Sequence, residues 1–164
     1  MILAPADIAS LAAAAGFQGN DLTTAIAVAL AESGGNTGPP DGDQGLAPGN
    51  GPSKGLWQIN VGQHAHPEMG SWNLYDPPTN AAAAFQIYTA GGGSFRAWTQ
   101  FLNGKYVSYL PAAAAGAAAI SQATVITAGA DGSAPQFLAP DSSGDDNSLL
   151  WGLGILALVI LFLD

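Results

Sequence analysis

The 164-residue sequence contains no cysteine, and it has only three lysine or arginine residues against twelve aspartates and glutamates, for a formal net charge of −9 at pH 7. Without cysteine the chain has no disulfides, no thiolate-bound iron–sulfur cluster and no thiol catalysis. Nucleic-acid binding depends on neutralising phosphates with basic side chains, so we expect no nucleic-acid partner. Charged residues make up only 9% of the chain, whereas about a quarter is usual in soluble domains.

Alanine and glycine are abundant instead, which predicts helices that pack closely through small side chains. Proline or a short polar residue precedes several helical segments, and glycine follows them, as is typical of helix ends. Asn20 or Asp21 is expected to cap the second helix, Asp76 the third and Ser94 the fourth, while Pro111 marks a kink or boundary in the last. We therefore predict an all-α domain over residues 1–120. The predicted helices span about residues 5–15, 21–33, 77–89, 95–102 and 105–120.

The end of the chain differs in composition. Residues 121–148 are rich in Ala, Gly, Ser, Pro and Asp, which predicts a flexible acidic linker. Residues 149–163, LLWGLGILALVILFL, are an unbroken apolar run, equivalent to roughly 22 Å of helix against a hydrocarbon core of ~30 Å. We expect a hydrophobic anchor helix, marginal as a transmembrane span, that binds a membrane or other protein subunits or forms a homo-oligomer. No basic segment precedes an apolar one at the N-terminus, so no ordinary secretory signal is expected.

A single acid, Glu32, interrupts the apolar run in AIAVALAESGGN, residues 25–36. The glycines after it are typical of a helix end, so the carboxylate is expected on the last turn of a core helix. Glutamate is seldom buried without a partner, and the helix dipole disfavours negative charge at this end. We therefore expect a raised pKa for Glu32 and a role in chemistry or in capping a neighbour.

Four stretches in this order resemble the lysozyme-like lytic transglycosylases, of the soluble-lytic-transglycosylase type that also occurs in bacteriophage particles. They are AESGGN (31–36), SKGLWQIN (53–60), LYDPPTNAAAAF (74–85) and FLNGKY (101–106), and the resemblance covers roughly residues 5–115. It implies a lysozyme-like fold, peptidoglycan glycan strands as substrate and Glu32 as the catalytic acid. Burial would keep such an acid protonated near neutral pH, as glycosidic cleavage requires. The implied substrate-binding residues are Ser33, Ser53, Gln58, Asn60, Tyr88 and Asn103.

The reaction type depends on a second carboxylate. Related lysozymes carry Asp where this chain has Ser53, which favours a transglycosylase that leaves a 1,6-anhydro ring over a hydrolase. Asp41 and Asp43, in the turn-rich loop of residues 37–53, keep a true muramidase open as an alternative. Where the family has an aromatic-Asn-x-Gly stretch, this chain has Phe-Leu-Asn-Gly at 101–104. This departure keeps a second alternative open, a structural virion protein of the tail that binds glycan or only packs.

The remaining candidate residues are aromatic or histidine. Trp57, Trp72 and Trp98 are predicted either in the core or as platforms for the apolar faces of sugars. His64 and His66 have no clear third ligand beside them, so we expect a loop role and no metal or cofactor. The resemblance and the apolar C-terminus together predict a virion enzyme that acts on the host cell wall from outside.

Overall fold

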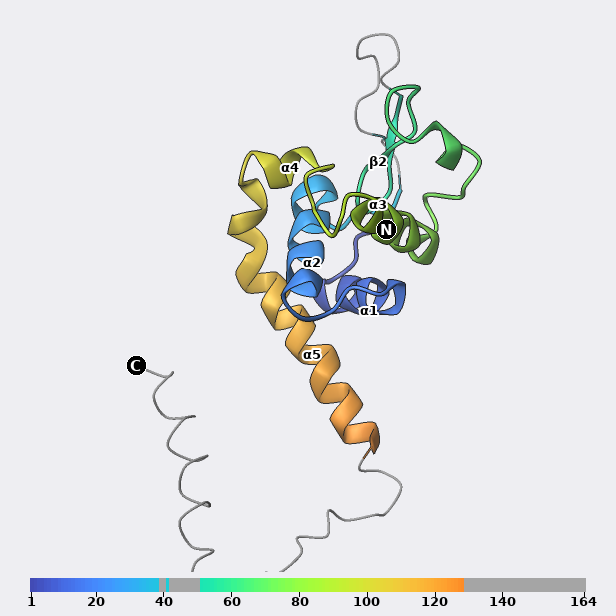
Figure 1. The fold of residues 1–164 in the computed structure, drawn as a ribbon. Helices are drawn as coiled ribbons and strands as arrows, with labels where there is room; N and C mark the ends of the chain where they lie inside the picture. Colours follow the sequence, from blue (N-terminus) through green and yellow to red (C-terminus); the bar gives the residue numbers. More distant parts are fainter. Residues whose placement is uncertain (39–40, 42–50, 129–164) are drawn as a thin grey trace, which may run out of the picture. The chain divides into compact units, whose positions relative to one another are not determined.

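The structure is a computed structural model, and it describes residues 1–38, 41 and 51–128 (Figure 1). It is mainly helical, which confirms the predicted fold class. The helices are α1 (Pro5–Ala15), α2 (Gly19–Ser33), α3 (Pro77–Ala90), α4 (Thr99–Leu102) and α5 (Leu110–Ala128), with the 3-10 helices η1 (Pro67–Met69) and η2 (Lys105–Tyr109). The strands of the described residues, β1 (Ser53–Lys54) and β2 (Ile59–Asn60), form one antiparallel pair, the hairpin.

Helix α2 is the centre of the domain, because α1, α4, α5 and η2 all contact it. Every side chain of the apolar stretch 25–30 is buried. A helix that is apolar on all sides is stable only when other elements surround it. The core continues into the hairpin through Leu56, Trp57 and Ile59, which are also buried. Beyond this buried stretch, the last residues of α2, which include Glu32, are only partly buried.

Small residues set the spacing between α1 and α5, as the composition predicted. A Cβ atom on Gly116 of α5 would lie 2.6 Å from the carbonyl oxygen of Pro5 in α1, so a larger residue would push the two helices apart. Pro111 lies in the first turn of α5, where its missing N–H does no harm, and it marks the boundary with η2. The predicted end at Ile120 is wrong, because α5 continues to Ala128.

The predicted linker, residues 121–148, therefore begins too early. Residues 121–128 contain neither Gly nor Pro, so nothing in them stops a helix until Gly129. The rest of that segment and the predicted anchor helix, residues 149–163, lie outside the described residues. Within the described part of the chain, no helix has both the length and the hydropathy that a membrane crossing requires.

Of the predicted N-caps, only Asp76 is confirmed: its Oδ2 accepts a hydrogen bond of 3.1 Å from the amide N of Thr79. Helix α2 begins two residues earlier than expected, after Gln18, so Asn20 and Asp21 lie inside it. The segment predicted to be helical from Ser94 is a turn that buries Phe95 and Trp98, and α4 starts only at Thr99. Burying two large aromatic side chains outweighs the preference of the short segment for a helix.

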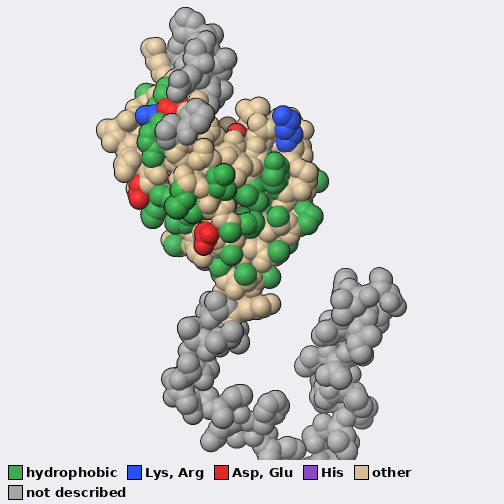
Figure 2. Space-filling view, turned by 180° about the vertical axis from the view of Figure 1, so that it is seen from behind, with side chains coloured by type: hydrophobic (Ala, Val, Ile, Leu, Met, Phe, Trp, Pro, Cys, Tyr) green, Lys and Arg blue, Asp and Glu red, His purple; other side chains and the backbone are tan. Residues whose placement is uncertain are grey.

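The surface carries few charges. Seen from behind, hydrophobic side chains are scattered over much of the domain between isolated acidic and basic ones (Figure 2). The exposed residues of α5 are mostly alanine. Single small apolar side chains at the surface are normal in soluble proteins and need no partner.

Candidate active site

The hairpin forms one wall of the site, and its turn needs a glycine. Gly55, directly after β1, has φ of +72°, and a Cβ atom there would lie 2.2 Å from the carbonyl oxygen of Leu74. Gln58 closes the turn with φ of 45°, an uncommon conformation for a residue with a side chain. Its amide N and its Nε2 both donate to the carbonyl oxygen of Gly55, at 3.1 and 2.8 Å. The hairpin turn is so short that no periodic pattern of apolar residues in the sequence could have predicted it.

Asn80 of α3 fastens this turn to the helical core. It is fully buried, its Oδ1 accepts from the amide N of Trp57 at 2.9 Å, and its Nδ2 donates to the carbonyl oxygens of Lys54 and Leu74 at 2.9 and 3.0 Å. Both ends of a buried amide are thus satisfied by backbone groups. This one side chain therefore bonds the backbone of the hairpin turn, and that of Leu74, to α3.

Two tryptophans connect the hairpin to its neighbours: Trp57 bonds to α2, and Trp98, directly before α4, bonds to the hairpin. The indole N–H of Trp57 donates to the carbonyl oxygen of Ala25 in α2 at 3.0 Å, and that of Trp98 donates to the carbonyl oxygen of Trp57 at 2.8 Å. Both side chains are buried, so both belong to the core, although Trp98 also lines the cleft. Trp72 is half-buried and packs against the core.

Between these elements lies a cleft of about 390 Å³. Glu32 lies at the end of α2, the hairpin and the loop after it supply one side, and the residues around the start of α4 supply the other. Except for two alanines and Trp98, the lining side chains are polar. The described residues that line the cleft are Glu32, Ser53, Gln58, Asn60, His64, Ala65, Ala97, Trp98, Thr99 and Gln100.

Glu32 is half-buried, and its Oε1 accepts a hydrogen bond of 3.0 Å from the backbone N–H of Gln100. This contact joins the end of α2 to the start of α4 and orients the carboxyl group in the cleft. Partial burial at a helix C-terminus favours the neutral acid, whereas donation by an amide N–H favours the carboxylate. The predicted rise in the pKa of Glu32 therefore stays a prediction.

Four of the seven predicted site residues, Glu32, Ser53, Gln58 and Asn60, come together in the cleft. Asn60 also shapes it, because its Oδ1 accepts from the amide N of Gly62 at 2.8 Å and so holds the loop after β2. His64, Thr99 and Gln100 line the cleft as well and were not predicted. His64 follows GLWQIN by only four positions, so its closeness to the motif was the available signal.

Three predicted residues lie elsewhere. The hydroxyl of Ser33 donates to the carbonyl oxygen of Ala29 and accepts from the amide N of Gly35, so it stabilises the end of α2. The hydroxyl of Tyr88 donates to Asp21 Oδ2 at 2.7 Å, and its ring packs among other aromatic side chains. Asn103 is exposed and contacts Gln100 but does not line the cleft.

Neither predicted second carboxylate lies in the described lining. Asp41 accepts a hydrogen bond from the hydroxyl of Tyr75, which raises the pKa of that tyrosine above its usual 10, first through the hydrogen bond and then through burial and charge. Lys54 extends over the ring of the same tyrosine. Asp43 lies outside the described residues. Among the residues that the structure describes, Glu32 is the only carboxylate that lines the cleft.

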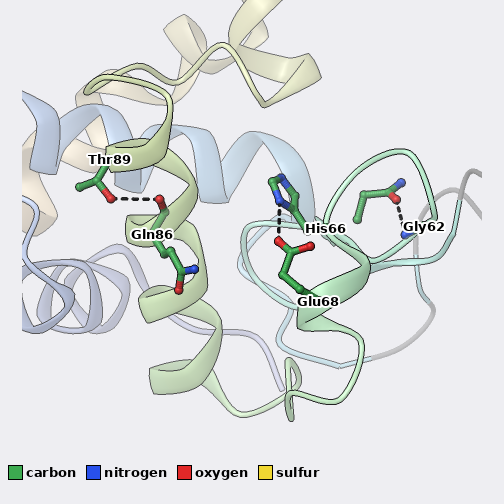
Figure 3. A network of polar contacts seen from close by, with 6 residues as sticks. Gly62, His66, Glu68, Gln86 and Thr89 are labelled. Atoms are coloured by element: carbon green, nitrogen blue, oxygen red, sulfur yellow. Dashed lines mark hydrogen bonds and ion pairs between the residues drawn. The ribbon is translucent and has the colours of Figure 1, made fainter.

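A smaller pocket of about 70 Å³ shares Gln58, Asn60 and Trp98 with the cleft, and His66 also lines it. His66 Nδ1 lies 3.3 Å from Glu68 Oε1, and the two side chains point toward one another beside α3 (Figure 3). The side chain of Glu68 is 60% exposed and that of His66 is 31% exposed, so solvent screens this pair and it contributes at most about 1 kcal/mol. No group of three His, Cys, Asp or Glu residues in the described part of the chain is arranged to hold a metal ion.

A family model described as a lysozyme-like domain matches residues 9–100, which is more than half of the chain. The chain belongs to the lysozyme-like domain family. The match begins in α1 and ends at Gln100, so it includes every described residue that lines the cleft. No curated protein and no solved structure matches the chain. At a coarse level, membership indicates that this lysozyme-like domain is a glycosidase that acts on peptidoglycan.

Proposed function

We propose that this lysozyme-like domain is a lytic transglycosylase that cleaves the β-1,4 bond between MurNAc and GlcNAc in peptidoglycan glycan strands. The observation that supports it is the carboxylate content of the cleft: Glu32 is the only described carboxylate in the lining, and Ser53 stands on the hairpin where related lysozymes have an aspartate. A hydrolase of this kind normally needs two carboxyl groups on either side of the scissile bond. A transglycosylase needs only one.

In the proposed reaction Glu32 acts first as an acid and then as a base. Its proton passes to the glycosidic oxygen as the bond to C1 breaks, while the carbonyl oxygen of the substrate's own N-acetyl group supports the developing positive charge. The resulting carboxylate then takes the proton of the C6 hydroxyl as that oxygen bonds to C1. No water is consumed, so the product has a 1,6-anhydro ring, and Glu32 returns to its protonated state.

The experiment is digestion of purified cell walls with the full chain, followed by mass spectrometry of the released glycan. We expect 1,6-anhydro-MurNAc ends, which are lighter by one water than hydrolytic ends. Glu32→Gln should lose nearly all cleavage, about 10²-fold or more, because the amide has no proton to donate. Reducing ends would instead identify a muramidase, and Asp41→Asn and Asp43→Asn would then be tested for its second carboxylate.

We also infer a role on a phage particle, where the enzyme would open the host wall locally and residues 149–163 would attach it to a membrane or to other subunits. This rests on the family resemblance and on the apolar C-terminus. The competing role, a structural virion protein with an inactive lysozyme-like domain, predicts that the wild-type chain releases no glycan from purified walls. Turbidity of a wall suspension separates the two.

A further inference from the structure

We propose that Gln100 is a further substrate-binding residue and that Asn103 is a positioning residue, which acts by fixing the orientation of the Gln100 side chain. The proposal rests on the proposed function of the cleft. It assigns a role to one residue that the motifs do not include, and it changes the role of Asn103 from a direct sugar contact to an indirect one.

Gln100 has two separate contacts with the site. Its backbone N–H donates to Glu32 Oε1 at 3.0 Å, while the residue itself lines the cleft and is half-buried. Any residue except proline keeps the backbone contact. A substitution of the side chain therefore tests glycan binding without removing the hydrogen bond that orients the catalytic acid.

The orientation of the Gln100 amide follows from a chain of hydrogen bonds that starts at a backbone group. The amide N of Lys105 can only donate, and it donates to Asn103 Oδ1 at 3.0 Å. This fixes Asn103 so that its Nδ2 faces Gln100, where it donates to Oε1 at 3.2 Å. Because a glutamine side chain has one acceptor oxygen and one donor nitrogen, Gln100 Nε2 is then the group that can donate to a ligand.

The ligand group that fits this donor is an oxygen with a lone pair, such as a sugar hydroxyl or the carbonyl of an N-acetyl group. Asn103 itself is exposed and does not line the cleft. A substitution of Asn103 should therefore affect the glycan only through Gln100, which makes the two side chains energetically coupled in binding.

The test uses the full chain with Glu32→Gln, so that binding is measured without turnover, and a soluble GlcNAc–MurNAc octasaccharide as the probe. Trp98 lines the cleft, so its fluorescence can report occupancy. Gln100→Met keeps length and helix propensity but removes the amide, and we expect about tenfold weaker binding from one lost hydrogen bond. Asn103→Asp still accepts from Lys105, but it no longer donates, so Gln100 should turn its oxygen toward the cleft and binding should weaken by a similar factor.

The decisive measurement is the double variant. If Asn103 acts through Gln100, adding Asn103→Asp to Gln100→Met changes the affinity by less than about twofold. Ser108→Asp introduces the same charge in η2, where the hydroxyl bonds only to the carbonyl of Lys105 among the described contacts, and it should bind like the parent. In the active enzyme, Gln100→Met should raise KM with kcat and the melting temperature unchanged, which a purely structural role would not produce.

Unchanged affinity of Gln100→Met, or additive losses in the double variant, would overturn the proposal. A wild-type chain that binds the octasaccharide but cleaves no wall would instead overturn the proposed function. A chain that cleaves walls while Gln100→Met binds as tightly as the parent would leave the function intact and remove only the role of Gln100.

Discussion

Asn80→Ala should destabilise the domain strongly, although this residue takes no part in the chemistry. The substitution removes three hydrogen bonds: those with the amide N of Trp57 and the carbonyl oxygen of Leu74 are buried, and the one to the carbonyl oxygen of Lys54 is partly buried. A lost bond that leaves a buried backbone group unpaired costs about 1 to 3 kcal/mol, so we expect a loss of about 3 kcal/mol or more in the free energy of unfolding. For a domain of this size that corresponds to a fall of roughly 10 °C in melting temperature.

The assay is urea and thermal unfolding of the full chain, monitored by circular dichroism and by tryptophan fluorescence. Asn80→Asp keeps the acceptor for Trp57, but it places a carboxylate at a fully buried position against the carbonyl oxygens of Lys54 and Leu74, so at neutral pH its loss should be at least as large as that of the alanine variant. Gln86→Ala, at an exposed position of the same helix, is the matched control and should change stability by less than about 0.5 kcal/mol. If Asn80→Ala costs less than 1 kcal/mol, the hairpin is not held by this side chain and our reasoning is wrong.

Three further outcomes follow from the site. Tyr88→Phe should leave wall cleavage unchanged, because the hydroxyl bonds to Asp21 outside the cleft. That hydrogen bond raises the pKa of Tyr88 above 10, so the small stabilisation it gives the folded state is present below pH 10 and is lost as the pH rises through the raised pKa. A fall in cleavage rate at equal stability would restore its predicted sugar contact. Trp98→Phe should lower the free energy of unfolding by about 1 to 3 kcal/mol and should also lower the cleavage rate. Trp98 lies directly before α4, and the substitution removes its 2.8 Å hydrogen bond to the carbonyl oxygen of Trp57. Normal unfolding and turnover would contradict this prediction. Truncation after Ala128 should keep the fold and the cleavage rate and abolish retention in particles or membranes, and retention by the truncated protein would refute the proposed anchor.

The fold class followed from local patterns that the tertiary structure did not alter. The unbroken apolar run at 25–30 predicted a buried helix, and the glycines after Ser33 predicted its end, so the place of Glu32 on the last turn was fixed before any packing was known. The cap at Asp76 is equally local, because its side chain bonds to an amide N only three residues away. The family resemblance added Ser53, Gln58 and Asn60, and all three line the cleft with Glu32.

The predictions from sequence were wrong where packing in the folded domain overrides the local preference of a segment. Ser94 is a good cap by itself, but the burial of Phe95 and Trp98 makes the following residues a turn and delays α4 to Thr99. Tyr88 lies on the motif-bearing helix, yet its hydroxyl is committed to Asp21, which is distant in the sequence.

Tertiary structure alone decided how the carboxyl group of Glu32 is oriented. The amide of Gln100 bonds to Glu32 across 68 positions, and the side chain of Asn80 bonds to the backbone of Trp57 across 23. Sequence periodicity reports which face of an element is apolar, but a single hydrogen bond between distant segments leaves no period. The sequence by itself therefore determined the fold class, α1, most of α2 and α3, and the place of Glu32, whereas the partners that hold its carboxyl group in the cleft depend on how α4, the hairpin and α3 pack around α2.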